Sequence, residues 1–250
     1  MTNRELRTVA RQISDGEDVL LHTGPGLLAG TDLPVGDLAD AVWGENSRFT
    51  RDRLESDPEA VRADWLEFWA DAAVDPASVT PRPVHRRVAE LVEAGHVSTV
   101  ITENVFGLLR EAGVPADRCI EFHGRVDEAA CVRCERTYDT APGDATGNRR
   151  CPACGGTLGL GIVLPSEPPA RANRLRAWTS AEDCDVYVGA GTRLPVYPTA
   201  ENAERALETG TDLLVVGDRP TALDDEATHR LRADPAGALG RLRDALAILG

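Results

Sequence analysis

Residues 18–30 have the sequence DVLLHTGPGLLAG, in which a short apolar run leads directly into a glycine-rich turn. An uninterrupted apolar run of this length is typical of a strand in a parallel sheet, where both faces are covered. Gly24, Gly26 and Ala29 fit the pattern G-x-G-x-x-G/A, whose small residues let the backbone and a helix N-terminus approach a pyrophosphate. The stretch therefore predicts a first strand–helix unit that binds a dinucleotide, and an ordinary glycine-rich turn is the alternative.

Further apolar runs repeat this strand pattern at residues 97–104, 118–124, 184–191 and 212–218. Helix patterns alternate with them, and those at residues 82–95 and 199–210 each end at a glycine suited to a C-cap. Alternating strands and helices predict an α/β fold built on a Rossmann-like, doubly wound parallel sheet.

Two segments interrupt this alternation. Residues 37–84 carry a tryptophan-containing amphipathic pattern, which predicts a helical insert. Residues 125–161 contain a cysteine-rich loop with little apolar sequence, which predicts a small zinc-binding insert. The Rossmann-like domain is then discontinuous and comprises residues 1–36, 85–124 and 162–250.

The composition is strongly acidic, with a net charge of −14 and a sequence pI near 4.8. This charge argues against direct binding of nucleic acid or of an anionic membrane. Every basic residue is an arginine, and the acidic excess with few large apolar residues is typical of proteins kept soluble in concentrated salt. A halophilic source is the favoured interpretation, and a GC-rich genome is the alternative. With no apolar signal-peptide core and no long apolar run, we expect a cytoplasmic protein without a membrane span.

Four of the six cysteines form two C-x-x-C pairs, and these are Cys131, Cys134, Cys151 and Cys154. Two such knuckles joined by a short excursion are the ligand set of a tetrahedral zinc ion. Disulfides are the alternative, but we expect reduced thiols in a cytoplasmic protein. Four thiolates close the coordination sphere, so the predicted zinc is structural. Cys119 and Cys184 lie in strand-like runs and are predicted to be buried core thiols.

Two polar residues end predicted strands, and both are candidate site residues. Asn104 ends the run at residues 97–104, and His123 nearly ends the run at residues 118–124. Ligands of open parallel sheets lie beyond the carboxyl ends of the strands, so both side chains are expected to face the crevice that Gly24 and Gly26 border. A histidine there can act as a general base near neutral pH, and a purely structural role is the alternative.

Together these motifs resemble the sirtuins, which are NAD-dependent protein lysine deacylases with a Rossmann-like domain and a zinc-ribbon module. TGPGLLAGTDLP (residues 23–34) is similar to TGAGISAESGIPDFR, and TENVFGLLREAG (residues 102–113) to TQNIDGLHERAG. IEFHG (residues 120–124) resembles the motif of the catalytic histidine. GTLGLGIVLPSEPP, VGAGTRLPVYPTA and LLVVGDRPTALDD resemble the later sirtuin motifs in the family's order.

The resemblance implies a reaction in which NAD loses nicotinamide and the acyl group of a protein lysine passes to ADP-ribose. His123 would be the base, and Asn104 would hold the ribose and a water. Val163 and Leu164 would line the acyl-lysine tunnel. The implied cofactor contacts, besides Asn104, are Gly24, Pro25, Gly26, Glu103, Gly191, Thr192, Arg193 and Gly217. The partner is then an acylated lysine of a protein substrate, and the oligomeric state stays open.

Several positions depart from the sirtuin motifs. The aspartate that holds the nicotinamide carboxamide is Phe106, and the D-F-R after Pro34 is replaced by residues 35–37, Val-Gly-Asp. The glutamine of TQN is Glu103, the serine of the GTS motif is Arg193, and Phe-Gly of the substrate-pairing strand becomes residues 165–166, Pro-Ser. Losing a buried polar partner costs about 1–3 kcal/mol, so several losses would weaken one pocket severely.

Three hypotheses therefore remain. The first is a sirtuin-like deacylase of reduced or altered activity. The second is a catalytically silent module that binds NAD, ADP-ribose or an acylated protein. The third is an interaction protein that keeps only the fold and the zinc.

Overall fold

The computed structural model describes residues 2–29, 31, 33, 35–75, 78–139, 150–165, 167–194 and 199–249. These residues form two compact units. Unit 1 comprises residues 1–29, 80–122 and 172–250, and unit 2 comprises residues 30–79 and 123–171. The domain boundaries expected from the sequence stay a prediction.

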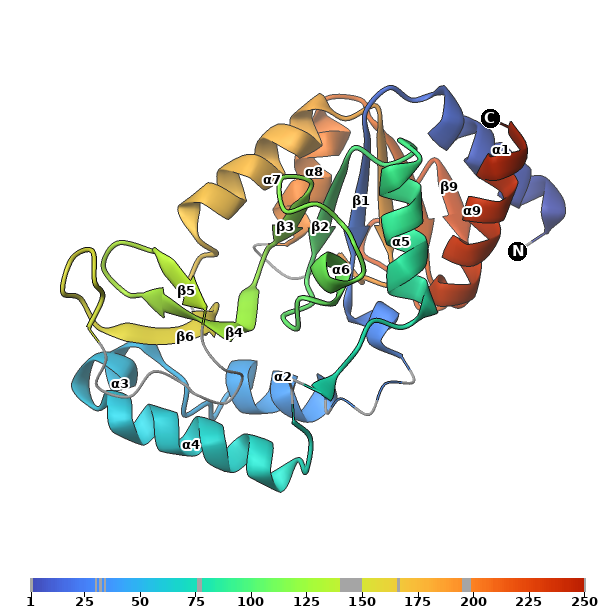
Figure 1. Ribbon diagram of the computed structural model, residues 1–250. Helices are drawn as coiled ribbons and strands as arrows, with labels where there is room; N and C mark the ends of the chain where they lie inside the picture. Colours follow the sequence, from blue (N-terminus) through green and yellow to red (C-terminus); the bar gives the residue numbers. More distant parts are fainter. Residues whose placement is uncertain are drawn as a thin grey trace. The chain divides into compact units, whose positions relative to one another are not determined.

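Unit 1 is built on a six-stranded sheet in the order β3-β2-β1-β7-β8-β9, in which all neighbouring strands are parallel (Figure 1). Its strands are β1 (Val19–Thr23), β2 (Thr99–Thr102), β3 (Cys119–Glu121), β7 (Val186–Ala190), β8 (Asp212–Val216) and β9 (His229–Leu231). The first five fall inside the five predicted runs, so the doubly wound parallel sheet is confirmed. Strand β9 was not predicted, because its three residues include only one apolar side chain.

Helices cover both faces of this sheet, as a doubly wound fold requires (Figure 1). One face packs against α1 (Asn3–Asp15), α5 (Pro83–Glu93) and α9 (Pro235–Leu249). The other face packs against α7 (Arg171–Asp183) and α8 (Ala200–Glu208). The short helices η1 (Pro25–Leu28) and α6 (Leu108–Glu111) follow β1 and β2.

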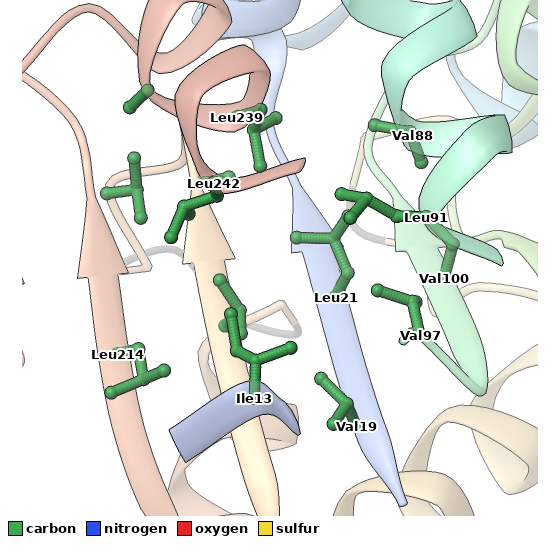
Figure 2. Packing of buried hydrophobic residues seen from close by; sticks show 14 of the residues in the cluster. Ile13, Val19, Leu21, Val88, Leu91, Val97, Val100, Leu214, Leu239 and Leu242 are labelled. Carbon is green, nitrogen blue, oxygen red and sulfur yellow. The ribbon is translucent and has the colours of Figure 1, made fainter. Parts of the chain in front are cut away.

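Side chains of each strand alternate between these two faces. Leu21 contributes to the core beneath α1, α5 and α9, whereas Leu20 contributes to the core beneath α7 and α8. Figure 2 shows the first of these cores, in which Ile13 of α1 and Leu239 of α9 pack around Leu21. Because both faces are buried, the strands consist of continuous apolar runs, and this is why the sequence revealed them.

The two cysteines outside the knuckles are buried thiols of the core, as predicted. Cys119 is 4% exposed and Cys184 is 6% exposed. Burial raises the pKa of the Cys184 thiol to about 12, so this thiol stays protonated.

Unit 2 combines three helices with a three-stranded antiparallel sheet in the order β5-β4-β6. The helices are α2 (Val35–Trp43), α3 (Arg51–Ser56) and α4 (Pro58–Asp71), and the strands are β4 (Gly124–Cys131), β5 (Thr137–Asp139) and β6 (Leu158–Ile162). Helix α3 packs directly on β6, since a Cβ at Gly159 would lie 2.2 Å from Leu54 Cδ2. The predicted helical segment and cysteine segment therefore share one compact unit.

Among the described residues, no helix has both the length and the apolar character needed to cross a membrane.

Candidate active site

A first group of predicted site residues lies in unit 1, where the strand order reverses, at β1 and β7. The turn after β1 contacts the loop after β7: the Gly24 N–H donates to the Ala190 carbonyl at 3.0 Å, and the Gly26 N–H donates to the Gly191 carbonyl at 2.9 Å. Open α/β sheets bind ligands outside the carboxyl ends of their strands at this switch point. Sequence elements far apart in the chain thus meet where a dinucleotide is expected.

The glycines of this turn are required by the close approach of the two loops. A Cβ at Gly24 would lie 2.5 Å from both the Gly191 carbonyl oxygen and Thr192 Cα, and one at Gly26 would lie 2.7 Å from that oxygen. Gly191 has a φ of +64°, which favours glycine. The amides of Gly24 and Gly26 are both used within the protein, and their role at a pyrophosphate stays a prediction.

Asn104 presents an unsatisfied donor at the carboxyl end of β2. Its side chain is buried, and its Oδ1 accepts the Phe106 N–H at 2.7 Å. The other amide atom, Nδ2, has no hydrogen-bond partner among the residues that the structure describes. A buried donor left unpaired costs about 1–3 kcal/mol, so this atom suits an acceptor oxygen on a bound molecule.

Glu103 and Thr192, both predicted cofactor residues, contact each other. The Thr192 hydroxyl donates to Glu103 Oε1 at 2.5 Å, and the same oxygen lies 3.3 Å from Nε2 of His22. His22 was singled out by no sequence motif. It is fully buried, and its Nδ1 lies 2.5 Å from the hydroxyl of Tyr187.

The other predicted cofactor residues of unit 1 have varied surroundings. Pro25 opens the short helix η1, and Arg193 is exposed. Gly217 follows β8 and is buried; its N–H donates to the Leu231 carbonyl at 3.1 Å. Their contacts with a cofactor stay predictions.

A second group of predicted site residues belongs to unit 2 and contains His123. The His123 carbonyl accepts the N–H of Val163, a predicted substrate residue, at 2.9 Å. Gly124 holds this arrangement because it has a φ of +76° and because a Cβ there would lie 2.0 Å from the Gly161 carbonyl oxygen. Leu164, the other predicted substrate residue, is 3% exposed. Pro34 and Ser166, named in the motif comparison, lie outside the described residues.

Trp43, at the end of α2, belongs to the same group and was not predicted from the sequence. Its ring lies against the His123 ring with centroids 6.2 Å apart and an interplanar angle of 52°. Its indole N–H donates to the Val163 carbonyl at 2.9 Å. Trp43 therefore contacts both the predicted base and a predicted substrate residue.

The four predicted metal ligands meet in one cluster in unit 2. The Sγ atoms of Cys131, Cys134, Cys151 and Cys154 all lie within 4.8 Å of one another. Cys131 and Cys154 are 3.5 Å apart at sulfur, and Cys134 and Cys151 are 3.7 Å apart. Tetrahedral zinc with bonds of about 2.3 Å requires sulfurs about 3.8 Å apart, so the cluster fits a structural zinc ion.

Both knuckles use the same backbone turn. The N–H that follows each pair returns to its first cysteine, from Glu135 to the Cys131 carbonyl at 3.0 Å and from Gly155 to the Cys151 carbonyl at 2.8 Å. Glu135 and Gly155 both have positive φ, +57° and +71°. The repeated geometry directs four sulfurs toward one point, as the spacing of the cysteines predicted.

With this geometry in place, the family can be identified. Residues 43–198 match the model of the Sir2 family. The chain belongs to the Sir2 family. The sirtuin resemblance drawn from the motifs is therefore confirmed.

Named Sir2 relatives cover nearly the whole chain. An NAD-dependent protein deacetylase of Haloarcula marismortui is 31% identical over 237 residues, which are 92% of this chain and 90% of the relative. NAD-dependent protein deacylase 2 of Archaeoglobus fulgidus is 30% identical over 225 residues, 88% of this chain and 87% of the relative. The structure of Sir2Af2 bound to a myristoylated histone peptide is 26% identical, with a TM-score of 0.74, and covers 99% of this chain and 98% of its own.

Proposed function

We propose that this protein is an NAD-dependent protein lysine deacylase, which passes the acyl group of a lysine to ADP-ribose and releases nicotinamide. The observation that carries the proposal is the buried Nδ2 of Asn104 at the carboxyl edge of the sheet, which has no partner among the described residues. The oxygen of a ribose hydroxyl can accept the hydrogen bond that Nδ2 has to donate. The named relatives are NAD-dependent deacylases and deacetylases, which supports the same cofactor here.

Each residue has a role that its surroundings support. NAD, when bound, supplies an electrophilic ribose carbon and a nicotinamide leaving group. Asn104 donates to the ribose, and the loops at Gly24 and Gly191 form the adjoining rim. His123 takes a proton from a ribose hydroxyl, because a histidine titrates near neutral pH. The side chains of Val163 and Leu164 line the tunnel of the acyl-lysine.

The direct test offers acetylated and longer-chain acylated lysine peptides with NAD to the zinc-loaded protein in multimolar KCl. Nicotinamide and deacylated peptide should appear in equal amounts. His123→Ala should abolish the deacylated peptide, whereas His96→Ala should leave it unchanged, because His96 lies in the turn after α5. Deacylated peptide formed by His123→Ala at the wild-type rate would contradict the role of His123.

A second candidate is a catalytically silent protein that binds NAD or ADP-ribose. The observation that favours it is Phe106, which is buried at the position where the sirtuin motif has the aspartate of the nicotinamide pocket. A phenyl ring offers no hydrogen bond to a carboxamide. This candidate predicts that ADP-ribose binds at least as tightly as NAD and that no peptide is deacylated.

We also propose a cytoplasmic, high-salt setting for the protein. The charge of −14, the absence of lysine and the Haloarcula relative support the high salt. Four cysteines placed for zinc support a reducing compartment.

A further inference from the structure

Four polar side chains contact one another in a row across three neighbouring strands of unit 1. Tyr187 of β7 contacts His22 of β1, His22 contacts Glu103 after β2, and Glu103 contacts Thr192 after β7. The register explains why they meet, because His22 is paired with Gly189 on one side and with Ile101 on the other. Tyr187 and Glu103 each lie two residues from those partners and so point to the same face of the sheet.

Three of these four side chains are buried, and the side chain of Glu103 is 18% exposed. His22 and Tyr187 have no exposed surface, and Thr192 is 7% exposed. Burial raises the pKa of the Tyr187 phenol well above its usual value, so its O–H stays protonated and donates to His22 Nδ1. The other ring nitrogen of His22, Nε2, faces the Glu103 carboxylate.

Glu103 Oε1 receives contacts from both directions. His22 Nε2 lies 3.3 Å away on the interior side, and the Thr192 hydroxyl donates at 2.5 Å on the loop side. The Thr192 oxygen in turn accepts the Leu194 N–H at 3.2 Å. Thr192 is thus fixed to the sheet through its side chain, and it adjoins Gly191, whose carbonyl accepts the Gly26 N–H.

We infer that Glu103 is a positioning residue which, supported by His22 and Tyr187, holds Thr192 and so fixes the Gly191–Thr192 rim against the glycine turn. This inference rests on the proposed function, because the rim adjoins the proposed NAD site. The Thr192 hydroxyl needs an acceptor at this position, and Oε1 of Glu103 supplies it.

The test measures ADP-ribose affinity by titration calorimetry on zinc-loaded protein in multimolar KCl. Glu103→Ala and Thr192→Val should each weaken binding about tenfold, the usual effect of losing a hydrogen bond to a charged group. The double variant should be no weaker than the weaker of the two single variants, because both substitutions remove the hydrogen bond between Thr192 and Glu103. Glu103→Gln and Thr192→Ser keep an acceptor and a hydroxyl, and both should bind within about threefold of wild type.

Glu208→Ala, an exposed glutamate at the end of α8, is the matched control and should bind as wild type does. Thr192→Val exchanges only a hydroxyl for a methyl group, so it stays informative if Glu103→Ala does not fold. Additive losses in the double variant, or unchanged binding by both single variants, would overturn the inference and leave the proposed function standing. A wild-type protein that binds neither ADP-ribose nor NAD would overturn both.

Discussion

Replacing Gly24 by alanine should separate the two loops at the switch point of the sheet. The new Cβ would lie 2.5 Å from the Gly191 carbonyl oxygen and 2.5 and 2.6 Å from Thr192 Cα and Cβ. These distances are about 1 Å shorter than the roughly 3.5 Å at which carbon atoms attract best. Two of the three nearest atoms belong to backbone, so rotating a side chain does not relieve the overlap.

The expected loss of stability combines two contributions. Overpacking costs about 1–3 kcal/mol, and displacement of the loop weakens the hydrogen bond from Gly24 to Ala190, worth about 1 kcal/mol. The total is about 2–4 kcal/mol. Because Thr192 moves with the loop, ADP-ribose affinity should fall as well.

The assay is urea unfolding at constant KCl, followed by circular dichroism, with Gly240→Ala as the control. Gly240 lies inside α9, and apart from its own helix backbone a Cβ there meets no atom of the described residues within 4 Å. The control should be stabilised by about 0.5–1 kcal/mol, since alanine favours a helix interior over glycine. A Gly24→Ala protein within about 0.5 kcal/mol of wild type would refute the close approach of the two loops.

Other predictions concern the metal, the proposed base, pH and salt. Cys134→Ser should lose the zinc and lower the melting temperature, whereas Cys184→Ser should keep one zinc per chain by elemental analysis. Trp43→Ala should slow deacylation roughly tenfold by freeing the His123 ring, while Trp43→Phe, which keeps a ring there, should retain most of kcat. The pKa of buried His85 is lowered from 6.5 to about 4, chiefly by desolvation. As pH falls from 6.5 to about 4, the unfolded chain binds a proton at His85 before the folded protein does. The free energy of unfolding should therefore fall by about 3 kcal/mol over this range. Urea titrations at several pH values should show this fall in the wild type and not in His85→Gln. Unfolding midpoints should rise from dilute to molar KCl, because a Debye length of about 3 Å screens the acidic surface.

The sheet was predictable because its strands are buried on both faces. Residues such as Leu20 and Leu21 face opposite cores, so β1 forms one apolar run that stands out from the amphipathic helices. The edge strand β9 lacks this signal. The zinc cluster was predictable for a different reason: its ligands are local, and the C-x-x-C spacing itself determines the knuckle turn.

The contacts of the candidate site were less predictable because they join distant segments. Trp43 and Val163 are 120 residues apart in the chain, and no spacing rule relates them. His22 lies in an apolar run, where a single histidine carries no pattern. Its partners Tyr187 and Glu103 belong to neighbouring strands, so their meeting depends on strand order and register, which only the structure shows.

The central claim is that the switch point and Asn104 bind NAD, and one titration tests it most directly. Zinc-loaded wild-type protein would be titrated with NAD and, in parallel, with ADP-ribose by calorimetry in multimolar KCl. The account predicts that both bind and that NAD binds more tightly, because the nicotinamide end adds contacts. ADP-ribose binding better than NAD would favour the silent binding protein, and no binding of either ligand would contradict the account.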